Sequence, residues 1–359
     1  MKYSLQLGKI YGIKVQIHWT FLILLAFIVF SNMRSGSGAE QTLWSILFIL
    51  TLFFCVTLHE FGHALAAKNF GIKTKDITLL PIGGLARLES MPEKPREELI
   101  VAISGPLVNV AIVAALYPLV HYTTDIESSL KELTAVNGQN FLFNLMFINI
   151  WLAIFNLIPA FPMDGGRVLR ALLALKLDRV KATAIAAKIG QLLAIGFVIV
   201  GFYSNPFLIF IGIFIFFGAK SEADYTQNKS FLEGYFVRDV IMKHYQTLET
   251  TDTIEQAVNM LLNGQNKSFL VIENEKIVGT LNRDEIIRAL NSSNKQTLIH
   301  TVMNKEVISL NVEMPLAHAW QVIQQHKMLM PVYASNKLVG TLDLENILEF
   351  IMVKNAKNN

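Results

Sequence analysis

Cysteine and charged residues are both scarce in this chain, and each scarcity excludes a class of protein. Cys55 is the single cysteine among 359 residues, so no disulfide can form within the chain. Charged residues make up 16%, and the net charge of +3 is too small to predict binding to nucleic acid. Hydrophobic residues make up 52% and gather in long runs within the first 220 positions. The composition therefore predicts a membrane protein with a soluble part.

An apolar run at residues 43–67 contains the pattern His-Glu-x-x-His, a zinc motif of metalloproteases. Residues four apart on a helix project from the same face, so His59 and His63 can bind one metal ion. Glu60 lies beside them, where it can polarise a water molecule at that ion. Such five-residue patterns also arise by chance. At membrane depth, however, each ionisable group costs about 2.5–3.5 kcal/mol on insertion scales, which favours a function.

A second motif supplies a candidate for the third ligand. It reads Asn-x-x-Pro-x-x-Pro-x-Asp-Gly-Gly, begins at Asn156 and follows another apolar run. Its prolines interrupt a helix and its glycines allow backbone to pack closely, so Asp164 is expected on an irregular segment inside the protein. A catalytic zinc site usually has three protein ligands, and Asp164 is the best remaining candidate. The alternative is a helix cap for the segment that begins near Gly165, and one carboxylate can also serve both purposes.

Together the two motifs resemble the site-2 protease family of intramembrane zinc metalloproteases, over about residues 1–220. The resemblance implies one Zn2+ per chain bound by His59, His63 and Asp164. It also implies Glu60 as the general base and Asn156 as a contact to the substrate or to the reacting carbonyl. Cys55, four residues before His59, is expected to be a packing residue and not a ligand.

The family resemblance extends to substrate capture. The segment Pro-Ile-Gly-Gly at residues 81–84 is similar to one that family members fold as a membrane-associated β-hairpin near the active site. As a strand edge, Gly83 and Gly84 would bind an extended substrate by strand addition, and Pro162 is assigned to substrate binding as well. The family implies regulated intramembrane proteolysis: hydrolysis of a peptide bond in or near the transmembrane segment of a membrane-bound regulatory protein, such as an anti-sigma or pro-sigma factor.

The apolar runs predict a polytopic α-helical membrane protein with about six transmembrane helices, at residues 15–30, 43–67, 98–120, 139–160, 182–203 and 206–219. The first run lacks a small-residue cleavage site, which favours a retained helix over a removed signal peptide. The last run has only 14 residues, against about 20 needed to span a bilayer. It either crosses where the bilayer is thin or enters and leaves on one side.

Basic residues concentrate in the segments after the second and fourth predicted spans, whereas the segments after the first and third carry one each. Because basic loops stay in the cytoplasm, this alternation predicts a multi-pass protein of the cell membrane with its N-terminus and C-terminal region in the cytoplasm.

The chain becomes polar after residue 220, and residues 221–229 are expected to be a linker. Beyond them lies a repeat with an offset of 61 residues, from Asp239 to His300 and from Ile277 to Leu338. Each copy predicts a strand, a helix, two strands and a helix. The region 230–352 therefore resembles a tandem cystathionine-β-synthase (CBS) pair, an α/β module with copies at about 236–291 and 297–352, before a polar tail at 353–359.

CBS pairs commonly bind adenine nucleotides through Ser or Thr three residues after the glycine of each repeat and Asp six residues after it. This chain has Asn282 and Glu285 in the first copy, and Asp343 and Asn346 in the second. A carboxylate in place of a hydroxyl would repel phosphate. Two interpretations stay open: a nucleotide-binding module that regulates access, or a structural module for homodimerisation or substrate docking.

Two other classes of function compete with the protease. A CBS pair also follows the membrane domain of some channels and transporters, so a CBS-regulated transporter or channel is an alternative, and a non-catalytic membrane scaffold is another. A transport path would need polar residues in several spans. The ionisable groups of the predicted spans instead concentrate in the zinc motifs, which favours the metalloprotease.

Overall fold

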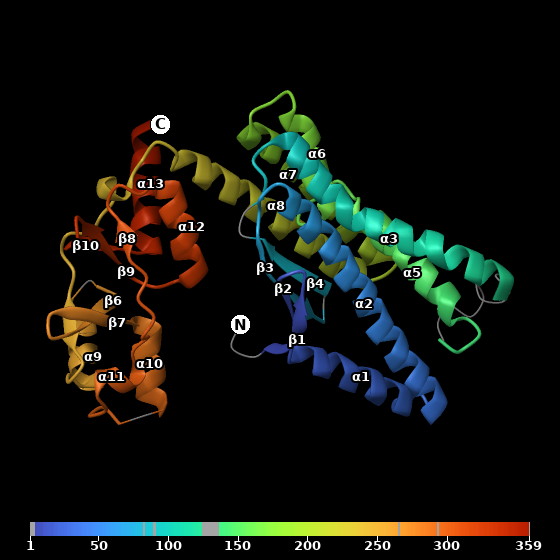
Figure 1. Ribbon diagram of the computed structural model, residues 1–359, viewed down its shortest axis with the longest axis horizontal. Coiled ribbons are helices and arrows are strands. Elements are labelled where there is room, and N and C mark those ends of the chain that lie inside the picture. The colour runs from blue at the N-terminus through green and yellow to red at the C-terminus, as the bar shows by residue number, and fades with distance from the viewer. Residues whose placement is uncertain are drawn as a thin grey trace. The chain divides into compact units, whose positions relative to one another are not determined.

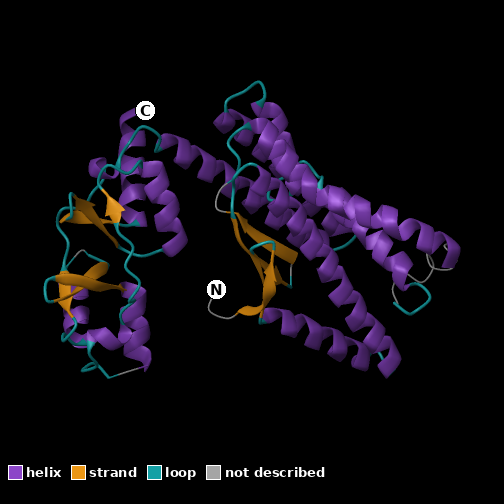
Figure 2. Cartoon of the chain, in the orientation of Figure 1, coloured by secondary structure: helices purple, strands orange, loops and turns teal. Residues whose placement is uncertain are grey.

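The chain divides into two units, Met1–Asp224 and Tyr225–Asn359. The computed structural model describes residues 4–81, 83–88, 91–123, 136–264, 266–292 and 294–358. The first unit consists mainly of long helices with one small sheet, and the second unit mixes short helices with two further sheets (Figure 2).

Three helices of the first unit are long and apolar enough to cross a membrane: α2 (Ala39–Asn69), α3 (Pro95–Thr123) and α7 (Arg179–Tyr203). Two shorter apolar helices are α1 (Thr20–Arg34) and α5 (Phe141–Asn156). Helix α3 packs against both α2 and α5 (Figure 1). Large apolar side chains on the outer faces are more than half exposed, for example Phe27, Leu107 and Phe202. Such an apolar exterior suits contact with lipid.

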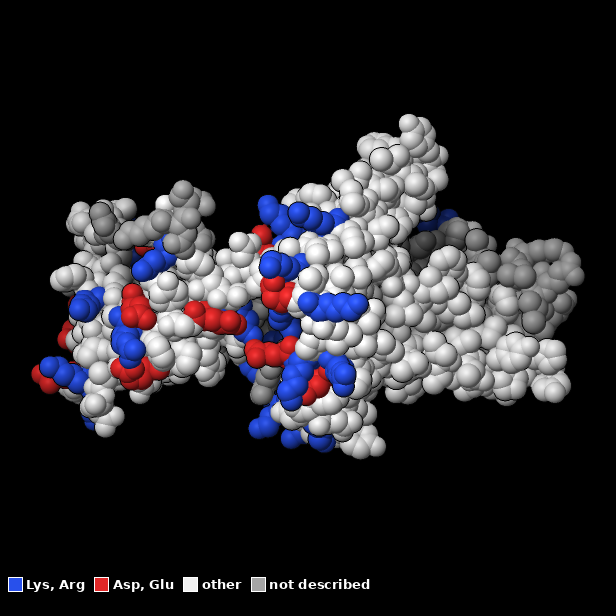
Figure 3. Space-filling view, turned by 90° about the horizontal axis from the view of Figure 1, so that it is seen from above, with Lys and Arg blue, Asp and Glu red and all other residues white. Residues whose placement is uncertain are grey.

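Charged side chains of the first unit gather toward one end, and a wide uncharged area covers much of the visible face (Figure 3). This separation agrees with helices that are embedded in a bilayer and end in polar segments. The structure thus supports a helical membrane domain with three long apolar helices.

The start of the first predicted span is wrong. Residues 15–18 belong to strand β2 (Ile13–His18), and helix α1 begins only at Thr20. Apolar and polar side chains alternate from Ile13 to His18, which is the period of a strand, and β2 pairs with β3 (Thr74–Leu80). An average of hydrophobicity over the whole run conceals this alternation.

The last predicted span and the predicted linker form one helix, α8 (Phe207–Phe231). No proline or glycine interrupts residues 219–231, so the polar segment continues the helix that the apolar segment begins. The division between the two units falls within α8. Similarly, helix α13 (Leu344–Asn358) extends into the predicted polar tail, whose last residue lies outside the described part of the chain.

The sheet of the first unit has the strand order β1 (Ser4–Ile10), β2, β3 and β4 (Gly83–Leu88). Tyr11 and Gly12 join β1 to β2 with positive φ angles of 51° and 89°, as a tight hairpin turn requires. One face of the sheet packs on α2, where Ile77 and Ala86 contact the cluster that contains Phe61. The sheet therefore covers the part of α2 that carries the His-Glu-x-x-His motif.

The second unit contains the predicted repeat twice. The first copy comprises β5 (Thr247–Glu249), α9 (Ile254–Asn263), β6 (Ser268–Glu273), β7 (Lys276–Asn282) and α10 (Arg283–Ser292). The second comprises α11 (Ile299–Val302), β8 (Leu310–Asn311), α12 (Leu316–His326), β9 (Met330–Ala334), β10 (Lys337–Leu342) and α13.

The repeated glycines have a packing role. A Cβ at Gly279 would lie 2.7 Å from the carbonyl oxygen of Asn304, and one at Gly340 would lie 2.5 Å from that of Met242. At each position the segment that enters one repeat pairs with the third strand of the other, as the bridges Thr280 to Asn304 and Met242 to Thr341 show. The glycines therefore allow the two copies to interlock.

Candidate metal centre

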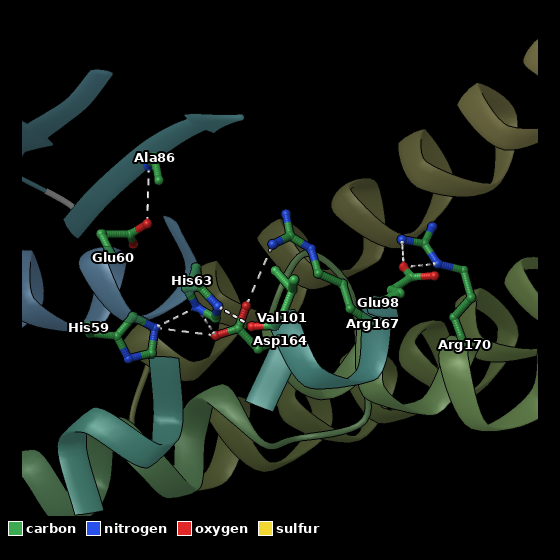
Figure 4. A network of polar contacts seen from close by, with 9 residues as sticks. All are labelled: His59, Glu60, His63, Ala86, Glu98, Val101, Asp164, Arg167 and Arg170. Atoms are coloured by element: carbon green, nitrogen blue, oxygen red, sulfur yellow. Dashed lines mark hydrogen bonds and ion pairs between the residues drawn. The ribbon is translucent and has the colours of Figure 1, made fainter. Parts of the chain in front are cut away.

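The two histidines of the α2 motif are buried and face each other. His59 and His63 are 6% and 4% exposed, and their Nε2 atoms lie 3.1 Å apart. They come from successive turns of one helix, so the four-residue spacing places both rings on the face that packs against α3. Figure 4 shows both rings directed toward Asp164.

The other nitrogen of each ring is held by α3. His59 Nδ1 lies 2.5 Å from Asn109 Oδ1, and His63 Nδ1 lies 2.7 Å from the Val101 carbonyl oxygen. Asn109 Nδ2 donates to Asn149 Oδ1, which leaves Asn109 Oδ1 to accept from His59. Because both partners are acceptors, each Nδ1 carries a proton, and in the neutral imidazole each Nε2 then presents a lone pair.

Asp164 completes a group of three convergent acceptors. Its Oδ2 lies 3.2 Å from His59 Nε2 and 3.0 Å from His63 Nε2. It is the first residue of α6 (Asp164–Ala174), while the helix cap is Met163 and makes no side-chain cap bond. The carboxylate is thus directed at the histidines and not used as a cap. A negative charge is favourable at this end of a helix.

The glycines after Asp164 bring it into place. A Cβ at Gly165 or Gly166 would collide with the backbone of residues 157–161, at distances that include 2.4 Å to the Leu157 carbonyl carbon and 2.6 Å to the Ala160 carbonyl carbon. The loop between α5 and α6 can therefore fold tightly against the first turn of α6 only because both residues lack a side chain.

The three acceptors fit a zinc ion. Two lone pairs and a carboxylate oxygen at these separations repel one another unless a cation lies between them, and the nearest cationic side chain, Arg167, lies 3.6 Å from the other oxygen of Asp164. Zn–N and Zn–O bonds of about 2.0–2.2 Å in a tetrahedral site place ligand atoms roughly 3.3 Å apart, close to the separations observed here. A Cβ at Gly105 of α3 would lie 2.7 Å from His59 Nε2 and 2.5 Å from His63 Cε1, so glycine keeps this space open.

Glu60 is directed away from this cluster. Its Oε2 accepts a hydrogen bond of 3.1 Å from the backbone N–H of Ala86 in β4 (Figure 4). A Cβ at Gly84 would lie 2.8 Å from Glu60 Cγ, so the glycine lets the strand approach the side chain of Glu60. The predicted base therefore lies between the histidine motif and the strand predicted to bind the substrate.

A buried ion cluster connects α3 to α6. Arg170, which is 1% exposed, donates to Glu98 Oε1 at 2.8 Å and to Glu222 Oε1 at 2.5 Å. Arg179 lies 3.2 Å from the second oxygen of Glu98. The Arg170 guanidinium also lies 5.0 Å from the ring centroid of Phe161, in the loop that leads to Asp164. Buried charges are therefore also present outside the zinc motifs, and Glu98 is one at the start of a predicted span.

The remaining predicted residues lie around the cluster without joining it. Asn156 ends α5, and among the described residues its side chain has no hydrogen-bond partner. Pro162 is exposed beside Gly218 of α8, whose Cβ would lie 2.6 Å from Pro162 Cδ. Gly83 and Gly84 begin β4. Cys55 is buried and outside the group of three.

Sequence reasoning missed Asn109, Asn149 and Gly105. The available signal was the presence of amide side chains inside the apolar runs 98–120 and 139–160, where a polar group needs a partner. It did not reveal which partner each one has.

The predicted nucleotide contacts of the second unit bond to one another. Asn282 N donates to Glu285 Oε2 and Glu285 N donates to Asn282 Oδ1, each at 2.9 Å. Asp343 and Asn346 repeat this reciprocal pattern at 3.2 and 3.0 Å. Both pairs thus form capping boxes at the starts of α10 and α13. Burial raises the pKa of the Asp343 carboxyl above its usual range.

A helical membrane domain with a buried His-His-Asp cluster defines a membrane metalloenzyme. The model of peptidase family M50 matches residues 47–199, and that of the CBS domain matches residues 237–292 and 299–353. The chain belongs to peptidase family M50, the site-2 proteases, and carries two CBS domains. The predicted resemblance to both families is confirmed.

Known proteins illustrate how far the similarity extends along the chain. Zinc metalloprotease MJ0392 of Methanocaldococcus jannaschii is 35% identical over 309 residues, which cover 86% of this chain and 85% of that protein. Stage IV sporulation protein FB of Bacillus subtilis is 33% identical over 136 residues, which cover 37% of this chain and 43% of that protein. The solved structure of a site-2 protease from M. jannaschii is 38% identical, covers 62% of this chain and 95% of that chain, and has a TM-score of 0.46.

The protein is therefore a multi-pass intramembrane zinc metalloprotease of the site-2 type with two CBS domains. Membership of a peptidase family favours this class over the CBS-regulated transporter or channel and over a scaffold.

Proposed function

We propose that this protease hydrolyses a peptide bond in or near the transmembrane segment of a membrane-bound regulatory protein, with one zinc ion held by His59, His63 and Asp164. The observation that carries the proposal is the convergence of two histidine Nε2 atoms and one carboxylate oxygen within 3.0–3.2 Å in a buried site. Asn109 and Val101 fix the tautomer that directs both Nε2 atoms at the ion.

Zinc, when bound, acts as a Lewis acid toward the scissile carbonyl and the attacking water. Glu60 accepts one proton of that water as the water oxygen bonds to the carbonyl carbon. Glu60 then returns this proton to the leaving nitrogen as the C–N bond breaks. Asn156 contacts the substrate or the reacting carbonyl from the end of α5. The apolar helices around the cluster exclude bulk water, which strengthens each of these polar interactions.

The substrate binds in an extended conformation. Backbone carbonyls in a helix are already hydrogen-bonded, so a transmembrane segment must unwind before its peptide bond can reach the cluster. Strand β4 is the last strand of its sheet and lies against Glu60 through Gly84. An extended segment adds to this edge beside Gly83 and Gly84, and Pro162 contributes to the binding surface.

Six helices cross the membrane in the proposed topology: α1, α2, α3, α5, α7 and α8. An even number places the N-terminus and the CBS pair on the same side, and the basic segments after α2 and α5 support the cytoplasm as that side. Helices α1 and α5 have 15 and 16 residues, shorter than a typical span, and fit where the bilayer is thin.

The CBS pair controls access or docks the substrate, and it supports a homodimer. The capping boxes at Asn282 and Asp343 favour a structural module over one that binds an adenine nucleotide, because the polar atoms that would hold phosphate and ribose bond to each other.

Separating the base from the ligands tests the proposed function. Glu60→Gln should abolish cleavage of a transmembrane substrate and leave about one zinc per chain, whereas Asp164→Ala should lose both zinc and cleavage. Metal content is measured by atomic absorption, and cleavage is followed on a membrane-embedded reporter. Full zinc retention in Asp164→Ala would remove Asp164 from the ligand set, and cleavage by Glu60→Gln would remove Glu60 from the chemistry.

A further inference from the structure

A backbone N–H at the edge of β4, that of Ala86, is already hydrogen-bonded to a side chain. In the described part of the first unit, β4 pairs with β3 on one side only. The Ala86 N–H donates to Glu60 Oε2, a side chain of α2, at 3.1 Å. A single N–H in this direction does not donate to β3 as well, so it belongs to the open edge of the strand.

The contact between Glu60 and β4 is close along the whole side chain. A Cβ on Gly84, two residues before Ala86, would lie 2.8 Å from Glu60 Cγ and 3.0 Å from Val56 Cγ1. Gly84 and Ala86 point to the same side of the strand, and Ala86 packs with the cluster that contains Phe61 of α2. A peptide added to this edge must therefore pass beside Glu60.

The Ala86 N–H and the Glu60 carboxylate thus each have two competing partners. Strand addition requires that a substrate carbonyl accept from edge N–H groups, and Ala86 N–H is one of them. The catalytic chemistry requires that the Glu60 carboxylate turn toward the cluster of His59, His63 and Asp164. In the arrangement observed, Glu60 satisfies the strand and not the cluster (Figure 4).

We propose that docking of an extended substrate on β4 releases the catalytic base: a substrate carbonyl replaces Glu60 as the acceptor of the Ala86 N–H, and the freed carboxylate turns to the metal centre. The inference rests on the proposed function, because it uses Glu60 as the base and β4 as the docking strand. It makes the exchange at Ala86 a determinant of specificity.

This exchange selects substrates by their conformation. A transmembrane helix has no free carbonyl to offer at its centre, so it leaves Glu60 bound to Ala86 and is not cleaved. A segment that has unwound can both occupy the site and release the base. Short peptides that reach the cluster without pairing to β4 meet a base that is still held, and they are hydrolysed slowly.

Replacing the donor tests the exchange. Ala86→Pro removes the N–H at an edge position, where proline is tolerated in sheets. A hydrogen bond to a charged group shifts an equilibrium by roughly 10- to 100-fold, so hydrolysis of a five-residue fluorogenic peptide should rise by at least about tenfold. Cleavage of a full-length transmembrane substrate should fall. Leu7→Pro, at the irregular position of the opposite edge strand β1, is the matched control and should change neither rate.

Three outcomes overturn the inference. If the five-residue peptide is cleaved at the parent rate while the transmembrane substrate is cleaved more slowly, β4 binds substrate but does not hold the base, and the proposed function survives. If neither rate changes, or if both rates fall in a variant that keeps its zinc, the exchange at Ala86 does not occur.

Hydrogen exchange provides a readout that does not depend on activity and applies if Ala86→Pro fails to fold. In the full-length protein without substrate, the Ala86 amide should exchange at least about tenfold faster in Glu60→Ala than in the parent, because its acceptor is gone. The same rate in both proteins would show that Glu60 is not the acceptor in solution.

Discussion

Asn109 Oδ1 accepts a hydrogen bond of 2.5 Å from the Nδ1–H of His59, across 50 residues of sequence and between two packed helices. Asn109 is fully buried, and its own amide nitrogen donates to Asn149 on a third helix. This bond decides which ring nitrogen of His59 is free to bind a metal ion, so a residue of α3 orients a candidate ligand on α2. Zinc sites depend on such supporting bonds nearly as much as on the ligands.

Removing this support should weaken zinc binding. Asn109→Ala should lower the affinity by about 10- to 100-fold, measured by chelator competition on the purified protein, because His59 loses the partner that fixes its tautomer. Asn144→Ala is the control, since Asn144 is also buried but its Nδ2 has no hydrogen-bond partner among the described residues. Unchanged affinity in Asn109→Ala would show that the histidine does not need its partner.

Space at the cluster can be tested separately from its bonds. Gly105→Ala would place a methyl group 2.7 Å from His59 Nε2, where the ion is expected, so the variant should lose zinc and activity together. Gly196→Ala on α7 adds the same methyl group where no atom lies within 4 Å, and it should retain both. Normal zinc content in Gly105→Ala would mean that α3 can move away from the histidines at little cost.

The candidate ligands His59, His63 and Asp164 were proposed from two motifs, each of which is local in the sequence. The spacing of His59 and His63 is a property of one helix, and the glycines after Asp164 indicate close packing of the backbone. The repeat of the second unit is equally visible, since each copy preserves its glycine and its order of strands and helices. Each of these features is visible within its own segment, whereas the meeting of Asp164 with the two histidines depends on how distant segments pack and was implied by the family resemblance.

The supporting groups could not be predicted because they depend on the crossing of helices. Nothing in the sequence shows that Val101 offers its carbonyl to His63 or that Ala86 offers its N–H to Glu60. The run that contains β2 was misread because its average hydrophobicity resembles that of a membrane helix. The predicted linker contains the division between the two units, and it is helical because its polar residues are also helix formers, so α8 continues through it.

The ion cluster at Arg170 should be important for stability. Arg170→Met leaves Glu98 buried with a weaker counter-charge, and breaking such a pair lowers the free energy of unfolding by about 3–5 kcal/mol. Thermal unfolding in detergent should show a large fall in midpoint. Lys181→Met removes an exposed pair with Asp178, is expected to change stability by less than about 1 kcal/mol, and is the control. Similar midpoints for the two variants would contradict the assignment.

Topology can be tested by labelling introduced cysteines. The native Cys55 is 4% exposed, so its background labelling should be low. With six spans, a cysteine at Ser35, between α1 and α2, should react with an impermeant thiol reagent outside intact cells. A cysteine at Ser335, in the turn between β9 and β10, should react only after lysis. Labelling of Ser335→Cys in intact cells would indicate an odd number of crossings, most simply because α8 does not span.

The CBS pair should respond weakly to ATP, and restoring the family pattern should strengthen the response. A ligand at 100 times its Kd adds about 2.7 kcal/mol to stability, so nucleotide binding should raise the melting temperature of the second unit in the full-length protein. In the parent, Asp343 and Asn346 bond to each other, and the Asp343 carboxylate opposes phosphate, so millimolar ATP should shift melting little.

The double variant Asp343→Thr, Asn346→Asp supplies the hydroxyl and the carboxylate of the family pattern and keeps groups that can cap α13. Its melting temperature should rise with ATP, while the unliganded variant should melt near the parent because Thr is also a good cap. Melting is followed by hydrogen exchange of α13, so that the membrane unit does not obscure the result. A strong shift with ATP in the parent would show that the pair binds nucleotide despite its capping boxes. No shift in the double variant would show that these two positions do not decide the affinity.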